Sequence, residues 1–242
     1  MARHRTPQEG HPHVTTPLSR RHVLRRAAFL AAGTVVGSQM LSSPALAQPA
    51  GPEPDKLRES VRRAQERNKR VLSGVPSLNG WEMEKTADHH GHIYTRPVPG
   101  LPVDGVQVRM GDVETVLVHV IRRFHYEVDQ LRRGDVTGWR HPSTVRKGMA
   151  ESNLASGTAV LIRPGSYPSG VRGGFFPQQL TVIRDILAEC DGVVRWGGDD
   201  KHPDEALFHI DVEPGDDRLP KLAEKIVEWD WTPGRGAGSG TV

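Results

Sequence analysis

The sequence predicts an α+β fold, a single domain in which a small antiparallel sheet packs against helices. Three segments place apolar residues at helical spacing, and short strand-like runs lie between them in mixed order rather than in regular alternation. The 195 residues that follow residue 47 of the 242 are enough for one ordinary domain with a sizeable core. No internal repeat divides the chain further.

Residues 1–47 have the organisation of an export signal. A twin-arginine pattern at 19–24 precedes an apolar stretch over 27–40, and Ala45-Leu46-Ala47 is a small-x-small cleavage site. The apolar stretch has about 14 residues, whereas a membrane span needs roughly 20. We therefore expect a twin-arginine signal peptide, export of the mature chain, and a location that is secreted or associated with the cell wall.

The basic charge of the chain lies in this leader. Residues 1–47 hold six arginines against one glutamate, while the whole chain has a net charge of only +3. The remainder is therefore slightly acidic, at about −2, which gives no reason to expect nucleic-acid binding. We also expect no transmembrane segment in the mature chain, and the sequence leaves the oligomeric state open.

Residues 48–76 are expected to form a linker and a charged helical segment. The stretch Gln48–Pro54 is rich in proline, and 57–72 has the apolar spacing of a weakly amphipathic helix. The predicted domain over 77–231 begins with a Gly- and Pro-rich part that contains strand-like runs at 92–95 and 106–108. Asp112 can cap the next helix, which we expect to end before Gly134.

The second half of the domain alternates helices and strands. Apolar spacing predicts a helix over 176–189 that Gly192 terminates, strands over 193–196 and 207–212, and a last helix over 218–229. The Gly-rich residues 232–242 are expected to be a flexible tail. Cys190 is the only cysteine, so no intramolecular disulfide is possible, and its apolar surroundings predict a buried thiol.

Three motifs occur in a fixed order along the domain. They are Asp-Val-Thr-Gly-Trp-Arg at 135–140, Ser-Asn-Leu-Ala-Ser-Gly-Thr-Ala-Val-Leu at 152–161, and Val-Arg-Trp-Gly-Gly-Asp at 194–199 followed by 204–211. Together they resemble the zinc D-alanyl-D-alanine carboxypeptidase and L-alanyl-D-glutamate peptidase family, which shares its fold with Hedgehog signalling domains. The resemblance covers Gly111 to Val212 and implies a Hedgehog/DD-peptidase-like fold.

The resemblance also implies a chemistry. In that family two histidines and one aspartate bind zinc, and an acidic residue three positions before the last histidine takes a proton from the zinc-bound water. Asp204 stands at this general-base position, and Arg140 keeps the arginine that faces the substrate.

The metal ligands themselves are missing. The resemblance places Leu154, Leu161 and Leu207 where the family has its two histidines and its aspartate. A leucine has no lone pair for a metal, and burying three of them stabilises a fold by about 1.5–3 kcal/mol each. We therefore predict no zinc cofactor. The alternative is a shifted zinc site that uses His209 and Asp211.

Other chemistries have weaker support. His89-His90-Gly91-His92 is a second histidine cluster, but a solvated loop explains it better. The chain has no Gly-x-Ser-x-Gly motif for a serine hydrolase, and the glycines of 170–174 are not followed by the Lys-Ser/Thr of a phosphate-binding loop.

We therefore expect a non-catalytic protein that binds peptidoglycan stem peptides, or another peptide, in a cleft. The expected substrate-binding residues are Arg140, Ser152, Trp196 and His209, with Asp204 beside them. Trp196 could instead be a core residue, and Arg140 could pair with a surface acid such as Glu151. Two other functions remain open: an active zinc D,D- or L,D-peptidase with displaced ligands, and a structural or partner-binding protein.

Overall fold

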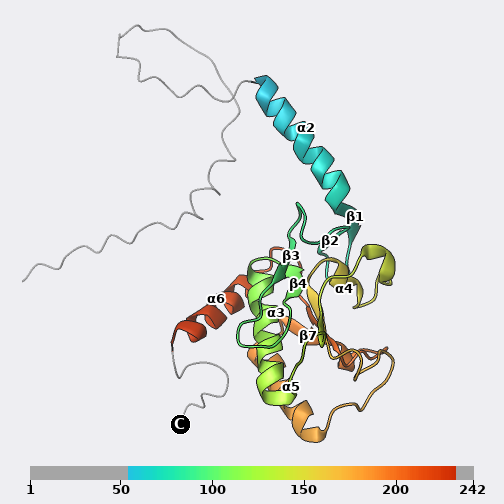
Figure 1. The fold of residues 1–242 in the computed structure, drawn as a ribbon, viewed down its shortest axis with the longest axis vertical. Coiled ribbons are helices and arrows are strands. Elements are labelled where there is room, and N and C mark those ends of the chain that lie inside the picture. Colours follow the sequence, from blue (N-terminus) through green and yellow to red (C-terminus); the bar gives the residue numbers. More distant parts are fainter. Residues whose placement is uncertain (1–53, 233–242) are drawn as a thin grey trace, which may run out of the picture. The chain divides into compact units, whose positions relative to one another are not determined.

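The computed structural model describes residues 54–232 (Figure 1). The predicted signal peptide over 1–47 and the Pro-rich linker before Pro54 lie outside these residues. So does the predicted tail, except for its first residue, Thr232.

The described residues form five α-helices, eight short strands and three short helical turns. In chain order they are α2 (Pro54–Val71), β1 (Leu72–Pro76), β2 (Glu82–Glu84), β3 (Ile93–Arg96), β4 (Val106–Arg109), α3 (Asp112–Arg123), the π-helical turn η1 (Phe124–Val128), β5 (Val136–Thr137), the 3₁₀ turn η2 (Pro142–Thr144), α4 (Ser152–Ala155), β6 (Ala159–Ile162), α5 (Pro177–Glu189), β7 (Val194–Trp196), the 3₁₀ turn η3 (Gly197–Asp199), β8 (Leu207–Ile210) and α6 (Arg218–Trp231).

Four strands form the central sheet in the order β5-β6-β8-β7, and each neighbouring pair is antiparallel. The pairs β1–β2 and β3–β4 form two further antiparallel sheets of two strands each. The predicted α+β class with small antiparallel sheets is therefore confirmed, and the strands expected near 92–95, 106–108, 193–196 and 207–212 are present.

The register of β8 with its neighbours decides which residues share a face. Three pairs are informative: Arg195 with His209, Trp196 with Phe208, and Leu161 with Leu207. Because side chains alternate along a strand and paired residues share a face, Arg195 and Trp196 point to opposite sides of the sheet. We call the face of Leu207 and His209 the α4 face, and the face of Phe208 and Ile210 the α3 face.

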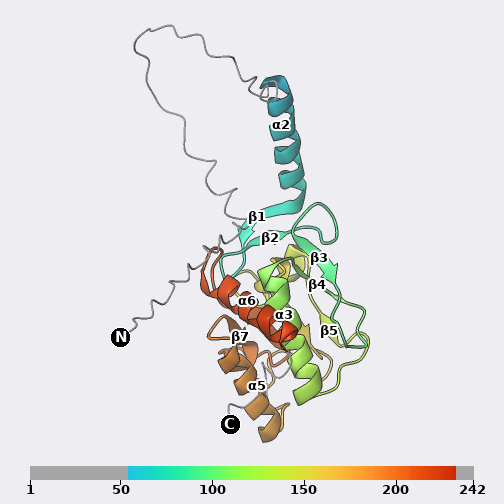
Figure 2. The ribbon, with the colours of Figure 1, turned by 90° about the vertical axis from the view of Figure 1, so that its left-hand side faces the viewer.

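Two helical layers cover the α3 face. Helix α3 packs on β6 and β8 and against α6 on its other side (Figure 2). Phe124, at the end of α3, contacts Phe208 and Phe175 edge to face, with ring centroids 6.1 and 6.0 Å apart. Helix α5 packs against η1 and β7. The hydrophobic core lies between these helices and the sheet and continues on the α4 face through Leu154, Leu161 and Leu207.

The helix that begins at Asp112 is shorter than its apolar pattern predicts. The α-helical part ends at Arg123, one π-helical turn follows, and Asp129 is extended. The backbone N–H of Leu131 bonds to Nδ1 of His125 at 2.9 Å instead of continuing the helical ladder. A side-chain acceptor has therefore replaced a helical carbonyl. Apolar spacing along the sequence cannot predict that the helix ends in this way.

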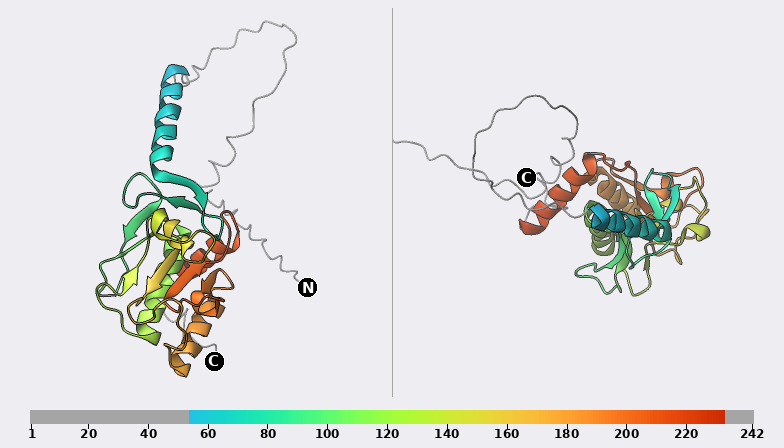
Figure 3. Two further views of the ribbon diagram at one scale, coloured as in Figure 1. Left: turned by 90° about the vertical axis from the view of Figure 1, so that its right-hand side faces the viewer. Right: turned by 90° about the horizontal axis from the view of Figure 1, so that it is seen from above.

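Helix α2 runs directly into β1 (Figure 3). Its polar surface is almost entirely exposed, and so are Leu57 and Val61, its first two apolar positions. Only Val71, at its last residue, is buried. None of the helices within 54–232 combines the length and the apolar character that crossing a membrane requires.

Candidate functional site

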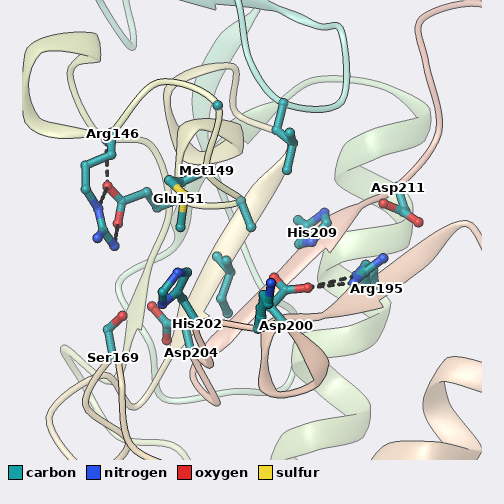
Figure 4. A pocket seen from close by; sticks show the side chains of 15 residues that line it. Arg146, Met149, Glu151, Ser169, Arg195, Asp200, His202, Asp204, His209 and Asp211 are labelled. Atoms are coloured by element: carbon teal, nitrogen blue, oxygen red, sulfur yellow. Dashed lines mark hydrogen bonds and ion pairs between the residues drawn. The ribbon is translucent and has the colours of Figure 1, made fainter.

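An open pocket of about 370 Å³ lies on the α4 face of the central sheet (Figure 4). Charged and apolar side chains from four parts of the chain line it. They are Leu78, Arg146, Gly148, Met149, Ala150, Glu151, Ser169, Arg195, Asp200, Lys201, His202, Asp204, Leu207, His209 and Asp211. Of the residues that the sequence singled out, Asp204, Leu207, His209 and Asp211 belong to this lining.

The alternation of β8 explains why these residues come together. Leu207 and His209 point to the α4 face, and Asp211 follows two positions later. Arg195 is the register partner of His209 on β7 and reaches the same pocket. One strand and its neighbour therefore supply an apolar group, an imidazole, a carboxylate and a guanidinium.

The polar half of the second motif holds another segment of the chain against the sheet. Ser152 Oγ accepts a hydrogen bond from the backbone N–H of Leu78 at 2.9 Å, and Thr158 Oγ1 accepts one from Asn79 Nδ2 at 2.9 Å. The hydroxyls of Ser77 and Ser156 lie 2.9 Å apart. These contacts place Leu78 at the pocket rim.

Ser152 itself is therefore occupied within the protein. Its side chain is fully buried, and its hydroxyl donates to the carbonyl of Met149 at 2.7 Å while accepting from Leu78. It is absent from the pocket lining. The structure gives Ser152 a positioning role for the 77–79 segment.

The glycine of the same motif meets a backbone requirement. Gly157 has φ of +69°, in the left-handed region that favours glycine, and a Cβ there would lie 2.8 Å from the backbone nitrogen of Arg109. Its carbonyl accepts a hydrogen bond from that same N–H at 2.8 Å. The small residues of this turn thus allow close approach of the chain to itself.

His209 is the most buried polar group of the pocket lining, at 1 % exposure. Its Nδ1 lies 3.1 Å from Nδ2 of Asn153, and its Nε2 has no hydrogen-bond partner among the described residues. Burial lowers the pKa of His209 below its ordinary value of 6.5, so the imidazole is neutral at neutral pH.

Asp204 is a half-buried carboxyl group of the pocket lining. Burial raises its pKa above the ordinary value of 3.8, and the nearby charge of Glu151 acts in the same direction. A hydrogen bond from Ser169, the backbone N–H of Ala206 at 3.2 Å and the charge of Arg140 oppose this shift only in part. Such a carboxyl group can exchange protons with a ligand or donate a hydrogen bond to it.

Two ion pairs frame the pocket (Figure 4). Arg146 binds both carboxylate oxygens of Glu151 at 2.9 Å, and Arg195 Nη2 lies 2.7 Å from Asp200. Sequence reasoning did not select Arg146, Met149 or His202. A motif comparison could not have found them, because they lie in loops beside the motifs rather than within them.

Arg140 and Trp196 lie outside the lining. Arg140 is exposed and makes no side-chain ion pair within the described residues, yet its charge acts on both Glu151 and Asp204. Glu151 pairs with Arg146 rather than with Arg140. Arg140 is therefore a free cation at the edge of the pocket.

Trp196 points to the α3 face, away from the pocket. Its ring is 3 % exposed, contacts Phe175 edge to face at 6.0 Å, and donates through Nε1 to the carbonyl of Glu205 at 2.8 Å. Trp196 is therefore a core residue, which was the alternative that the sequence left open for it. The residue of β7 that reaches the pocket is its neighbour Arg195, which the sequence had not selected as a binding residue.

The three leucines at the expected ligand positions are all in the hydrophobic core. Leu154, Leu161 and Leu207 are at most 4 % exposed, and Leu161 lies directly opposite Leu207 on the neighbouring strand. None carries a donor atom, so these residues do not fit a zinc ion. Nor does the described part of the chain bring together three His, Cys, Asp or Glu side chains in a metal-binding group.

Glu205, an acid close in sequence to the alternative ligands His209 and Asp211, is engaged elsewhere. Its two carboxylate oxygens accept hydrogen bonds from the backbone N–H groups of Gly173 and Gly174 at 2.7 and 2.8 Å. Glu205 therefore holds the loop over 170–174 in place, which is a structural role.

The remaining candidates of the sequence lie apart from the pocket. In the 89–92 cluster, His92 binds the buried Glu84 through Nδ1 at 2.8 Å, and Arg109 lies 3.4 Å from the same carboxylate. Burial raises the pKa of the Cys190 thiol to about 12, so it is not a nucleophile at neutral pH.

Comparison with protein-family models, with curated proteins and with solved structures found no match in any of the three. A function for this chain therefore has to be inferred from the residues of the pocket and from the motif resemblance.

Proposed function

We propose that this protein is an exported, non-catalytic member of the carboxypeptidase-like proteins with the Hedgehog/DD-peptidase fold, and that it binds peptidoglycan stem peptides in the pocket beside β8. Three motifs of the zinc peptidases are retained while the three ligand positions are leucines. That combination carries the proposal. The twin-arginine leader supports delivery to the cell wall, where such peptides occur.

The charges of the pocket support a peptide ligand. Arg140 is a cation without an ion-pair partner in the described structure, and it suits the terminal carboxylate of a D-Ala peptide. Asp204 and Asp211 provide acceptors for N–H groups, while Leu78 and Met149 provide apolar contact area. A peptide combines these three kinds of groups at short spacing.

Calorimetric titration of residues 48–242 with a muropeptide ending in D-Ala-D-Ala tests the proposal. We expect binding with a dissociation constant below the millimolar range, and Arg140→Ala should weaken it about tenfold, which is about 1.4 kcal/mol. Arg58→Ala, on the exposed helix α2, is the matched control and should bind like the natural chain. No heat of binding at millimolar peptide would overturn the proposal.

A structural or partner-binding protein is the second candidate. The observation that favours it is that Leu154, Leu161 and Leu207 pack into the core, so that side chains fill the place where the family holds its metal. Failure of all cell-wall peptides to bind a folded protein would favour this candidate.

An active zinc peptidase with displaced ligands is tested by the metal content of the mature chain after dialysis, purified without a histidine tag. Stoichiometric zinc, together with hydrolysis of a D-Ala-D-Ala peptide that a chelator abolishes, would replace the non-catalytic proposal. The ligands to examine would then be His209 and Asp211, which share the pocket lining.

A further inference from the structure

Nε2 of His209 is a buried nitrogen without a hydrogen-bond partner in the described part of the chain, and its ring lines the pocket. An unpaired buried polar group of this kind destabilises the fold, because it has lost its hydrogen bond to water without gaining another. The protein therefore gains free energy when a molecule in the pocket supplies the missing partner. Whether that partner is a hydrogen-bond donor or an acceptor depends on which ring nitrogen of His209 carries the proton.

The surrounding hydrogen bonds decide where this proton lies. The backbone N–H of Asn79 donates to Oδ1 of Asn153 at 3.2 Å, so Nδ2 of Asn153 is the atom that faces His209. Nδ2 can only donate, so His209 Nδ1 accepts this bond and the neutral ring carries its proton on Nε2. The carbonyl of Ile210 lies 3.2 Å from Nδ1 and accepts from Asn79 Nδ2 at 2.7 Å, but a proton on Nδ1 would face the N–H group of Asn153 at 3.1 Å.

The charges near the ring select the kind of acceptor. Asp211, Asp200 and Arg195 are the charged groups that act on His209. Arg195 is already paired with Asp200, while Asp211 makes no ion pair in the described structure. An anionic acceptor at Nε2 would be repelled by Asp211, so an uncharged carbonyl oxygen is favoured. The carboxylate of Asp211 then offers an acceptor to an N–H group of the same ligand.

We infer that the pocket recognises an amide group, whose carbonyl oxygen accepts a hydrogen bond from His209 Nε2–H while a neighbouring N–H of the ligand donates to Asp211. The inference depends on the proposed function only in taking this pocket as a ligand site. It assigns His209 as a specificity residue for uncharged amides over carboxylates.

The experiment is nitrogen-15 NMR of the histidine rings in labelled residues 48–242. We expect His209 to show a protonated Nε2 and an unprotonated Nδ1. Addition of N-acetyl-L-alanine methylamide, a small diamide, should shift the Nε2 resonance, whereas sodium acetate at equal concentration and ionic strength should not. A protonated Nδ1, a shift with acetate alone, or an Nε2 that the diamide leaves unchanged to 100-fold excess over the protein would overturn the inference.

Variants separate recognition from folding. His209→Gln keeps an N–H donor and should retain diamide binding within about threefold, whereas His209→Phe should lose it at least tenfold, or about 1.4 kcal/mol. His89→Gln, at an exposed histidine outside the pocket lining, is the matched control and should bind like the natural chain. If His209→Phe does not fold, the Nε2 resonance of the natural chain still decides the matter, because a diamide that binds without shifting this resonance would contradict a role for His209.

The outcome is distinguishable from failure of the proposed function. A diamide that shifts Nε2 while muropeptides do not bind would leave the amide site standing and remove the cell-wall ligand. Muropeptides that bind without any effect on the His209 ring would do the opposite.

Discussion

At the scale of single residues, Asp204 is where structural stability and ligand binding conflict. Its carboxyl group is partly buried in the pocket, and burial raises its pKa above 3.8. A carboxyl group whose folded-state pKa is raised destabilises the folded protein once the pH exceeds the unfolded value, because ionisation is easier in the unfolded chain. Residues of binding sites commonly show this cost.

We therefore expect Asp204→Asn to stabilise the protein at pH 7 by roughly 1 kcal/mol. The gain should be absent near about pH 3, where the carboxyl is protonated in both states, and should grow as the pH rises past 3.8. Urea unfolding at the two pH values measures it. Asp211→Asn, at an exposed position of the same pocket, is the control, and an equal gain there would contradict burial as the cause.

At the scale of elements, the most informative connection joins the segment over 77–79 to α4 and the central sheet. Asn79 donates through Nδ2 to Thr158 Oγ1 at 2.9 Å and to the carbonyl of Ile210 at 2.7 Å. All of these groups are buried. A loop that is remote in sequence is thus fixed beside β8, and its Leu78 becomes part of the pocket.

Asn79→Ala should reduce the free energy of unfolding by about 1–3 kcal/mol, because the buried Ile210 carbonyl loses a partner. Asn68→Ala removes the same kind of side chain from an exposed position of helix α2, and should change the free energy of unfolding by less than about 0.5 kcal/mol. Chemical denaturation of the two variants side by side provides the comparison. Similar losses in both would show that the hydrogen bonds to Thr158 and Ile210 contribute little.

The strands β7 and β8 show how far the sequence pattern alone can identify a residue that faces the pocket. The sequence predicts β7 and β8 where they occur, and it predicts that neighbours on a strand face opposite ways. It does not state which of Arg195 and Trp196 meets the pocket. The pairing of Arg195 with His209 decides this, and a shift by one residue would have exchanged the two.

At the scale of the whole molecule, one buried arginine connects the helices of the α3 face. Arg123, 5 % exposed, lies 2.6 Å from Glu127 and 2.8 Å from Asp185, and also binds Glu189. Burial alone would raise the pKa of Glu189, but hydrogen bonds from His119 and Arg123 hold it below its ordinary value of 4.5. The end of α3 is thereby tied to α5.

Arg123→Ala should cost roughly 3 kcal/mol at neutral pH, because the carboxylate of Glu189, whose side chain is 13 % exposed, loses its cation. Since the pKa of Glu189 is lowered, its contribution is present above pH 4.5 and is lost as the pH falls below that value. The difference between variant and natural chain should therefore shrink in acid. Thermal unfolding from pH 7 downward measures this, with Arg122→Ala, whose pair with Asp230 is more exposed, as the mild control. A difference that stays constant with pH would rule out this linkage.

The sequence by itself determined the α+β class, the helices predicted over 176–189 and 218–229, the strands predicted over 92–95, 106–108, 193–196 and 207–212, and the absence of metal-donor atoms at positions 154, 161 and 207; it did not predict β5 and β6 of the central sheet. Apolar spacing, glycine positions and residue chemistry are local properties, so they can be identified from the sequence alone. Only the tertiary structure decided that Ser152 is buried under Leu78, that Trp196 belongs to the core, and that Nε2 of His209 lacks a partner. These facts depend on strand register and on contacts between segments more than 50 residues apart, and no local pattern specifies such contacts.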